Sequence, residues 1–286
     1  MNSFDTSSAT PRAERTLGRI LLEQGKLDPQ AAEQVLRLQK DKNLRFGEAA
    51  VELGLVSEAD MRQALALQFD YPYLHAGESG YSTDLVAAYD PFSPQVEALR
   101  ALRTQLMLRW FAGNKALAVV GVDDETSASR LSANLAVVFS QLGERTLLID
   151  ANLRGPQVSG LFKLDNRMGL SDILADRADL TAITRIPEFV DLSVLPAGTQ
   201  APNPAELLAR PNQGGLLDAL SGSFDVILVA TPPASQASDF QAVAARTRGA
   251  LISVRKNQTR LDDVVGVKTM LAAAGAEVVG AVLNGA

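Results

Sequence analysis

The residues best suited to chemistry follow an apolar run near the middle of the chain. Ala116 to Val122 is apolar, and the segment Gly121 to Ser129 then occupies the place of a phosphate-binding loop. The loop positions for glycine, lysine and serine hold Ser127, Ala128 and Ser129. The lysine of such a loop contacts the β- and γ-phosphates, and the serine hydroxyl binds Mg²⁺. The pattern therefore indicates a phosphate-binding loop in which alanine replaces the lysine.

The elements that must position this loop predict an α/β fold. From about residue 93 onward, apolar β-rich runs alternate with helical stretches such as Leu131 to Leu142 and Asp262 to Ala274. The runs are Ala116 to Val122, Thr146 to Asp150, Leu192 to Leu195, Val226 to Val229, Leu251 to Val254 and Val278 to Leu283. Strands that are apolar throughout, interleaved with helices, predict a mostly parallel sheet with helices on both faces. Ligands of such sheets bind at the carboxyl ends of the strands, where this loop lies.

Several segments of this region carry the signature of a known family. They are Ser140 to Asp150, Leu195 to Gly198, Pro202 to Leu208 and Phe224 to Pro233. Together they resemble the tyrosine autokinases of bacterial exopolysaccharide loci, which are chain-length-determinant kinases related to MinD and ParA-type ATPases. The resemblance begins at about Phe92. It implies a P-loop NTPase-like fold and a role in exopolysaccharide assembly and chain-length control.

The same resemblance identifies catalytic positions that are replaced. Ala128 stands at the loop lysine, Asn152 at the second aspartate of an Asp-x-Asp strand, and Ala230 at the Walker B aspartate that helps to place Mg²⁺. No catalytic residue is therefore expected. A vestigial nucleotide site is expected at Gly121, Ser127, Ser129, Asp150 and Arg154. Arg154 has two open roles, contact with nucleotide or a partner subunit, and structural support.

The loop also carries three carboxylates, at Asp123, Asp124 and Glu125. Their negative charge opposes the binding of a polyanion. A hydrogen bond to a charged group contributes about 1.5–3 kcal/mol, and like charges about 4 Å apart repel by about 4 kcal/mol near a protein surface. Losing the lysine and gaining one close carboxylate should weaken Mg-ATP binding by roughly three orders of magnitude. The sequence predicts a pseudokinase without a cofactor or metal. The alternative is an active tyrosine autokinase or ATPase that uses ATP and Mg²⁺ through unusual contacts.

A motif for assembly is intact. Glu97, Arg100 and Arg103 match the Glu-x-x-Arg-x-x-Arg motif, which in the resembled family bridges neighbouring subunits of a ring. The spacing places the three side chains along one helix face, so Glu97 and Arg100 can pair within the helix or across an interface. We expect an oligomer with related tyrosine kinase subunits or with the cytoplasmic part of a membrane polysaccharide co-polymerase. The alternative is a solvated helix face with weak internal pairing.

The first quarter of the chain contains an internal repeat. The triplet that ends in Gly18 aligns with the triplet that ends in Gly47, and Gly25 aligns with Gly54 at the same offset. Each copy predicts a short helix closed by a glycine, followed by a second helix that begins at a capping residue. The repeat therefore predicts a small helical domain.

This paired pattern resembles the N-terminal domain of type II secretion and pilus-assembly ATPases, some of which bind cyclic di-GMP between the two copies. The resemblance makes Arg15, Gly18, Arg45 and Gly47 candidates for cyclic di-GMP binding. Glycine near a helix start lets backbone N–H groups approach a phosphate, and arginine can pair with phosphate. The first copy departs from the pattern, with Thr16 at the arginine position. The alternative is a helical interaction module whose glycines are caps.

The predicted parts are a flexible tail over 1–14, a helical two-repeat domain over 15–74, a linker over 75–92 and a kinase-like domain over 93–286. The chain has no cysteine, which excludes Cys-based zinc sites, and its single histidine, His75, argues against multi-histidine metal sites and Ser-His-Asp chemistry. A net charge of −6 argues against nucleic acid as a partner. Without a spanning apolar run or a signal core, we expect a cytoplasmic protein that reaches the inner face of the plasma membrane through a partner.

Overall fold

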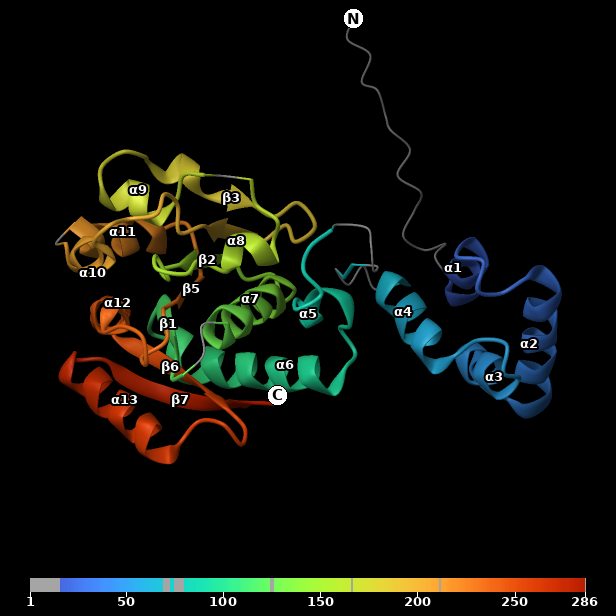
Figure 1. Ribbon diagram of the computed structural model, residues 1–286. Helices are drawn as coiled ribbons and strands as arrows, with labels where there is room; N and C mark the ends of the chain where they lie inside the picture. The colour runs from blue at the N-terminus through green and yellow to red at the C-terminus, as the bar shows by residue number, and fades with distance from the viewer. Residues whose placement is uncertain are drawn as a thin grey trace, which may run out of the picture. The chain divides into compact units, whose positions relative to one another are not determined.

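The computed structural model describes residues 16–68, 73–74, 80–123, 126–165, 167–210 and 212–285 (Figure 1). The chain divides into two compact units, Met1–Pro72 and Tyr73–Ala286. Each unit is considered by itself. None of the helices in the described ranges is long and apolar enough to cross a membrane.

The first unit is all helical and follows the duplicated sequence pattern. Its helices are α1 (Leu17–Glu23), α2 (Pro29–Lys42), α3 (Phe46–Glu52) and α4 (Glu58–Gln68). The two short helices, α1 and α3, are the equivalent parts of the two copies, and both have seven residues. The unit closes around its own apolar core, which includes Leu21, Val35, Ala49 and Ala64.

Local signals in the sequence set these helix ends. Gly25 and Gly54 adopt φ values of +66° and +67°, the left-handed conformation that ends a helix with little strain only at glycine. Asp28 caps α2 by accepting the backbone N–H three residues later at 2.7 Å. Ser57 accepts the backbone N–H of Asp60 at 3.1 Å, and the Asp60 carboxylate accepts the Ser57 N–H at 3.4 Å. This reciprocal pair is a capping box before α4, at the capping residue that the repeat predicts.

The second unit alternates strands and helices. In chain order its elements are α5 (Val86–Tyr89), α6 (Pro94–Leu106), the π-helical turn η2 (Met107–Phe111), β1 (Ala116–Gly121), α7 (Ser127–Ser140), β2 (Thr146–Asp150), α8 (Val158–Leu161), α9 (Leu170–Leu174), the 3₁₀ turn η3 (Leu180–Ala182), β3 (Thr184–Arg185), β4 (Leu192–Leu195), α10 (Pro204–Ala209), α11 (Asn212–Ser221), β5 (Val226–Ala230), α12 (Asp239–Thr247), β6 (Gly249–Arg255), α13 (Leu261–Ala273) and β7 (Glu277–Asn284). Apart from β3, every strand coincides with a predicted apolar run to within a few residues.

The sheet has seven strands in the order β3-β4-β2-β5-β1-β6-β7. All neighbouring strands are parallel except β3, which pairs antiparallel with β4. Alternate residues of β1 enter different cores, Leu117 and Val119 on the face of α7, and Ala118 and Val120 on the face of α12 and α13. The predicted α/β fold, a mostly parallel sheet with helices on both faces, is confirmed (Figure 1).

The prediction of a linker over residues 75–92 is wrong for the described part, residues 80–92. Leu85, Ala87 and Ala88 are fully buried in the core that α7 shares. The side-chain amide of Asn134 on α7 donates to the Asp84 carbonyl and accepts the Ala87 N–H, both at 2.9 Å. This segment therefore belongs to the α/β unit. Residues 75–79, with His75, lie outside the described residues.

Trp110, in the π-helical turn η2 before β1, lies in the core. It is 5% exposed, and its indole N–H donates to the Ala116 carbonyl at 2.9 Å. Its ring lies so close to the start of β6 that a Cβ built on Gly249 would be 2.2 Å from a ring carbon. Glycine at this position is thus a packing requirement.

Candidate functional site

The candidate site is the loop between β1 and α7, at the carboxyl edge of the sheet. β1 ends at Gly121 and α7 begins at Ser127. Ala128, at the lysine position, is buried at 1% exposure and carries no charge. The start of α7 therefore offers a helix N-terminus without the cation that a phosphate-binding loop uses.

One polar atom of this helix start has no hydrogen-bond partner. The Ser129 hydroxyl is fully buried, and among the described residues nothing donates to it or accepts from it. A buried hydroxyl left unpaired costs free energy. Such an unpaired group marks a position that is suited to a ligand, and here it is the position of the Mg²⁺-binding hydroxyl in the resembled loop.

The described part of the loop is held by neighbouring loops. The carbonyl of Gly121 accepts the Ala234 N–H at 2.8 Å, and the carbonyl of Val122 accepts the Ser235 N–H at 3.0 Å. Hydrogen bonds from the loop after β5 thus fix the end of β1.

Asp123 ties the same loop to the segment after β6. Its carboxylate accepts from the Thr259 hydroxyl at 2.8 Å and from Arg255 Nε at 3.3 Å. The Asp123 carboxylate is therefore already paired with the Arg255 guanidinium and the Thr259 hydroxyl beside the site. Asp124 and Glu125, which the sequence predicts to add further negative charge, lie outside the described residues.

Asp150 ends β2 and is completely buried. Its carboxylate accepts backbone N–H groups of Asn152 at 3.1 Å, Gln157 at 3.1 Å and Val158 at 3.0 Å. Burial raises the pKa of Asp150 to about 6, and the three backbone hydrogen bonds oppose that rise. The carboxylate thus organises the loop after β2.

The two other positions that would support Mg²⁺ do not supply a carboxylate. The Asn152 amide donates to the Gly155 carbonyl at 2.7 Å and accepts the Gly155 N–H at 3.1 Å. Ala230 lies opposite Asp150 in the β2–β5 ladder and is fully buried. Within the described ranges, no group of three or more His, Asp or Glu side chains is arranged to hold a metal ion. Apart from the Ser129 hydroxyl, these residues do not fit Mg²⁺ with a nucleotide.

Arg154 pairs with a buried carboxylate, a geometry that favours structural support among its two predicted roles. Its Nε and Nη2 atoms donate to the two carboxylate oxygens of Asp239 at 2.8 and 3.2 Å. Asp239 is buried at the start of α12, so the pair connects the loop after β2 to α12. A bidentate pair of this kind holds both side chains in one geometry.

A groove that the sequence did not predict lies beside the candidate site. Its volume is about 730 Å³. It is lined by the start of α7, by one side of α6 and by the end of β7, including Ser127, Arg130, Leu99, Leu102, Val282 and Asn284. The lining residues come from segments far apart in the chain, which is why no local spacing indicates the groove.

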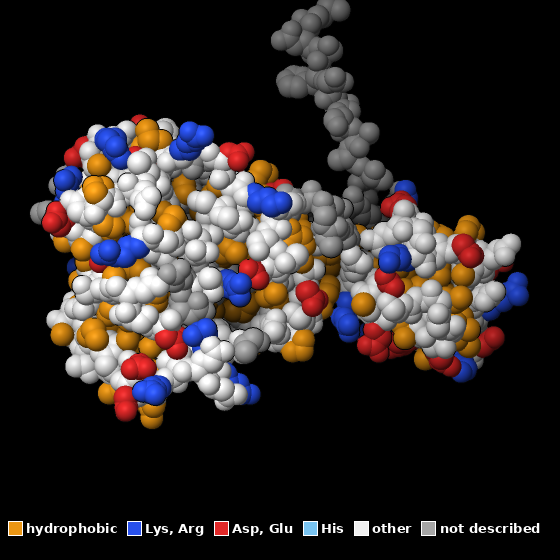
Figure 2. All heavy atoms as spheres, viewed as in Figure 1, with side chains coloured by type: hydrophobic (Ala, Val, Ile, Leu, Met, Phe, Trp, Pro, Cys, Tyr) orange, Lys and Arg blue, Asp and Glu red, His pale blue; other side chains and the backbone are white. Residues whose placement is uncertain are grey.

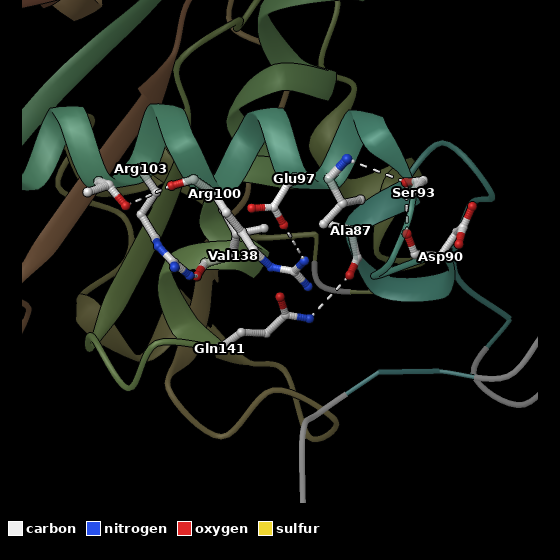
Figure 3. A network of polar contacts seen from close by, with 10 residues as sticks. Ala87, Asp90, Ser93, Glu97, Arg100, Arg103, Val138 and Gln141 are labelled. Carbon is white, nitrogen blue, oxygen red and sulfur yellow. Dashed lines mark hydrogen bonds and ion pairs between the residues drawn. The ribbon is translucent and has the colours of Figure 1, made fainter. Parts of the chain in front are cut away.

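The assembly motif on α6 is partly used within the chain (Figure 3). Arg103 donates to the Val138 carbonyl of α7 at 2.6 Å, so it holds α6 against α7. Arg100 donates to Glu97 at 3.1 Å. The Glu97 side chain is 73% exposed and that of Arg100 only 19%. Glu97 is thus the member of the motif that reaches the surface.

In the helical unit, packing explains both glycines predicted to bind cyclic di-GMP. A Cβ on Gly18 would lie 3.0 Å from the Phe46 ring, and one on Gly47 would lie 2.5 Å from the Met61 methyl group. Both are therefore sites of close helix contact, while the caps are at Gly25 and Gly54.

Two of the predicted cyclic di-GMP residues line one groove of about 600 Å³, namely Arg45 and Gly47. Glu48, Glu52 and Glu58 line the same groove, so its charge is mixed. Arg15 lies outside the described residues. On the face shown in Figure 2, basic and acidic side chains are interspersed and form no basic stripe.

No protein-family model matches the sequence. The chain is similar to the tyrosine-protein kinase YwqD of Bacillus subtilis, at 30% identity over 203 residues that cover 71% of this chain and 86% of YwqD. It is also similar to the tyrosine-protein kinase wzc of Salmonella typhi, at 32% identity, where the aligned region is 71% of this chain and only 28% of wzc.

Solved structures of bacterial tyrosine kinases and of MinD have a similar fold. The kinase domain of the Escherichia coli tyrosine kinase ETK matches with a TM-score of 0.66 and 32% identity, over 70% of this chain and 79% of that domain. The cell division ATPase MinD of Pyrococcus furiosus matches with a TM-score of 0.52 and 26% identity, over 60% of this chain and 72% of MinD. The α/β unit is thus a MinD-like P-loop NTPase fold. The chain belongs to the bacterial tyrosine-protein kinases.

Proposed function

We propose that this chain is a catalytically degenerate, kinase-like subunit of exopolysaccharide biosynthesis and chain-length control. It works by assembly with related tyrosine kinase subunits, or with the cytoplasmic part of a membrane polysaccharide co-polymerase. In this proposal the chain is cytoplasmic and reaches the inner face of the plasma membrane through that partner. Nucleic acid has no part in it.

The observation that carries the proposal is the set of replaced side chains around the loop. Ala128 removes the phosphate-binding cation, Asn152 is engaged with Gly155, and Ala230 supplies no carboxylate. Phosphoryl transfer depends almost entirely on positioning and on neutralising charge. A site without these groups lacks the means to do either.

Phosphotransfer from Mg-ATP tests this function directly. The chain should neither phosphorylate itself nor hydrolyse ATP above background. The variant with Ala128→Lys, Ser127→Gly and Ala230→Asp restores the family residues and is the matched control for the assay. Phosphotyrosine formed by the unaltered chain would contradict the proposal.

Assembly is proposed to use the exposed side of the α6 motif. Glu97 reaches the surface, and Arg100 beside it can exchange an internal pair for one across an interface. Sedimentation of the chain with an active related kinase should show a complex that Glu97→Lys abolishes. Arg109→Glu is the control, since it changes a charge in the neighbouring η2 turn outside the motif. A complex unaffected by Glu97→Lys would exclude this surface.

The second candidate function is a working autokinase or ATPase. Two observations favour it, the unpaired Ser129 hydroxyl and the groove of about 730 Å³ beside it. If this candidate were correct, Ser129→Ala would abolish ATP turnover. The same substitution has no effect on activity in the degenerate subunit.

The helical unit is proposed to respond to cyclic di-GMP. Arg45 supports this because its guanidinium lines a groove and can pair with phosphate. The three glutamates of that groove oppose it by charge. Calorimetric titration with cyclic di-GMP decides the question, with Arg45→Ala as the test variant and Arg37→Ala on the exposed side of α2 as its control.

A further inference from the structure

The two edges of the sheet differ in how they are protected. β3, at one edge, has two residues, one of which is Arg185. β7, at the other edge, has eight residues, and from Val278 to Asn284 none is charged or a proline. Natural sheets protect a free edge by shortening it, by a β-bulge, by placing charges or proline on it, or by covering it. The β3 edge is short and carries a charge, whereas on β7 the register shift lies before Gly280 and the stretch from Gly280 to Asn284 has no such protection within the described residues.

The outer edge of β7 is accessible. Every residue of β1 and β5 is buried, whereas no residue of β7 is. The inner edge pairs with β6 along its whole length, with one register shift before Gly280 and a regular ladder from there to Asn284. In the part of the chain that the structure describes, no strand pairs with the outer edge. Its backbone N–H and C=O groups form a template for another strand.

An apolar surface flanks this edge. Leu261 and Val265 at the start of α13 are 76% and 54% exposed, and Leu283 near the end of β7 is 64% exposed. α13 begins where the parallel strands end, so these side chains lie at the same end of the sheet. They also share a face, because Leu283 pairs with Val254, which packs in the same core as Val267 of α13. Figure 2 shows hydrophobic side chains at the surface over α13.

We propose that β7 pairs antiparallel with β7 of a second copy of this chain, which joins the two sheets through a two-fold axis. An axis perpendicular to the sheet keeps both α13 helices on one face and places the start of each beside the end of its copy, so that each exposed apolar group faces the partner copy. This surface lies on β7 and α13 and does not include the α6 motif. The inference therefore does not depend on the proposed function.

A second copy fits this edge better than a different protein does. The charged residue of β7 is Glu277 at its start, so an antiparallel register over Val278 to Asn284 places only uncharged side chains opposite each other. Self-complementarity of this kind is what a two-fold interface requires. The edge carries no charge pattern that would select a partner of opposite sign.

The absence of cysteine from the sequence gives a direct test. Ala281→Cys places one thiol on the exposed part of β7, close to its copy across the axis. Mild oxidation should convert most of this variant to a disulfide-linked dimer. Leu108→Cys is the control, because Leu108 is 71% exposed on η2, outside this surface, and should cross-link only at the rate of random collision. Equal cross-linking of the two variants would overturn the proposal.

Sedimentation equilibrium of the full chain provides the second measurement. The unaltered chain should dimerise, and Ala281→Lys with Leu283→Lys should weaken dimerisation at least about tenfold, since charge on both strands then meets across the axis. Leu108→Lys should leave dimerisation unchanged. A circular dichroism melt verifies that each variant is folded.

Three outcomes would overturn the inference. They are a monomer at every concentration, a dimer that tolerates both lysines, and a dimer lost only with Glu97→Lys. The last outcome would assign association to the α6 motif, so failure of this inference is distinguishable from failure of the proposed function.

Discussion

At the scale of single residues, two side chains of the loop after β2 make contacts that hold the fold. Asn152 closes its own loop on Gly155, and Arg154 holds buried Asp239. The sequence could show that these positions had changed, because the family resemblance aligns them. It could not show what the replacements contact, since Asp239 lies far from Arg154 in the chain.

Asp150 predicts a pH dependence of stability. Its pKa rises from 3.8 to about 6 on folding, so the folded state holds a proton that the unfolded state has released. The free energy of unfolding should therefore fall as pH rises from about 4 to about 6, by up to about 3 kcal/mol. Urea unfolding at several pH values, compared with Asp150→Asn, measures this contribution. A constant difference between the two proteins across that range would contradict it.

Arg154 and Arg177 each pair with a buried aspartate, and losing the two arginines should have unequal costs. Asp239 has Arg154 as its side-chain partner, whereas Asp172 also accepts the backbone N–H groups of Gly169 and Thr199. Arg154→Ala should therefore destabilise the chain by about 1–3 kcal/mol, since it removes the partner of a buried carboxylate, although the arginine itself is 42% exposed. Arg177→Ala should cost less. Chemical denaturation of both variants checks the order, and the reverse order would refute the assignment.

At the scale of elements, periodicity and apolar runs predicted the strands and helices that carry the site. β3 was missed because two residues give no pattern, and it exists only through its pairing with β4. The sequence predicts a linker where the single-turn helix α5 lies, because four residues are too few to show a helical period. Its burial comes from contact with α7, which is tertiary information.

Close packing between elements predicts opposite effects for two glycines. Gly249→Ala should destabilise the α/β unit by about 1–3 kcal/mol, because the new methyl group overlaps Trp110. Gly266→Ala is the matched control, since nothing lies within 4 Å of a Cβ there and it is in helix α13. That change should stabilise by about 0.5–1 kcal/mol. Thermal unfolding compares them, and a destabilising effect confined to Gly266→Ala would be inconsistent with this packing.

At the scale of the whole molecule, the chain combines a helical repeat unit with a MinD-like α/β unit of the bacterial tyrosine kinases. The sequence predicted both units. It also predicted that the loop between β1 and α7 lies at the carboxyl ends of the parallel strands. It did not predict the groove beside that loop, which forms only when α6, α7 and β7 come together. The fold is that of its family, and Ala128 stands where the resembled loop carries its lysine.

Titration of the full chain with Mg-ATP by isothermal calorimetry tests this central claim most directly. The variant with Ala128→Lys, Ser127→Gly and Ala230→Asp is the reference. Removal of the cation and of the metal support predicts no binding heat for the unaltered chain, with affinity at least roughly a thousandfold below that of a working site. Micromolar binding of Mg-ATP by the unaltered chain, abolished by Ser129→Ala, would contradict the account and restore the autokinase.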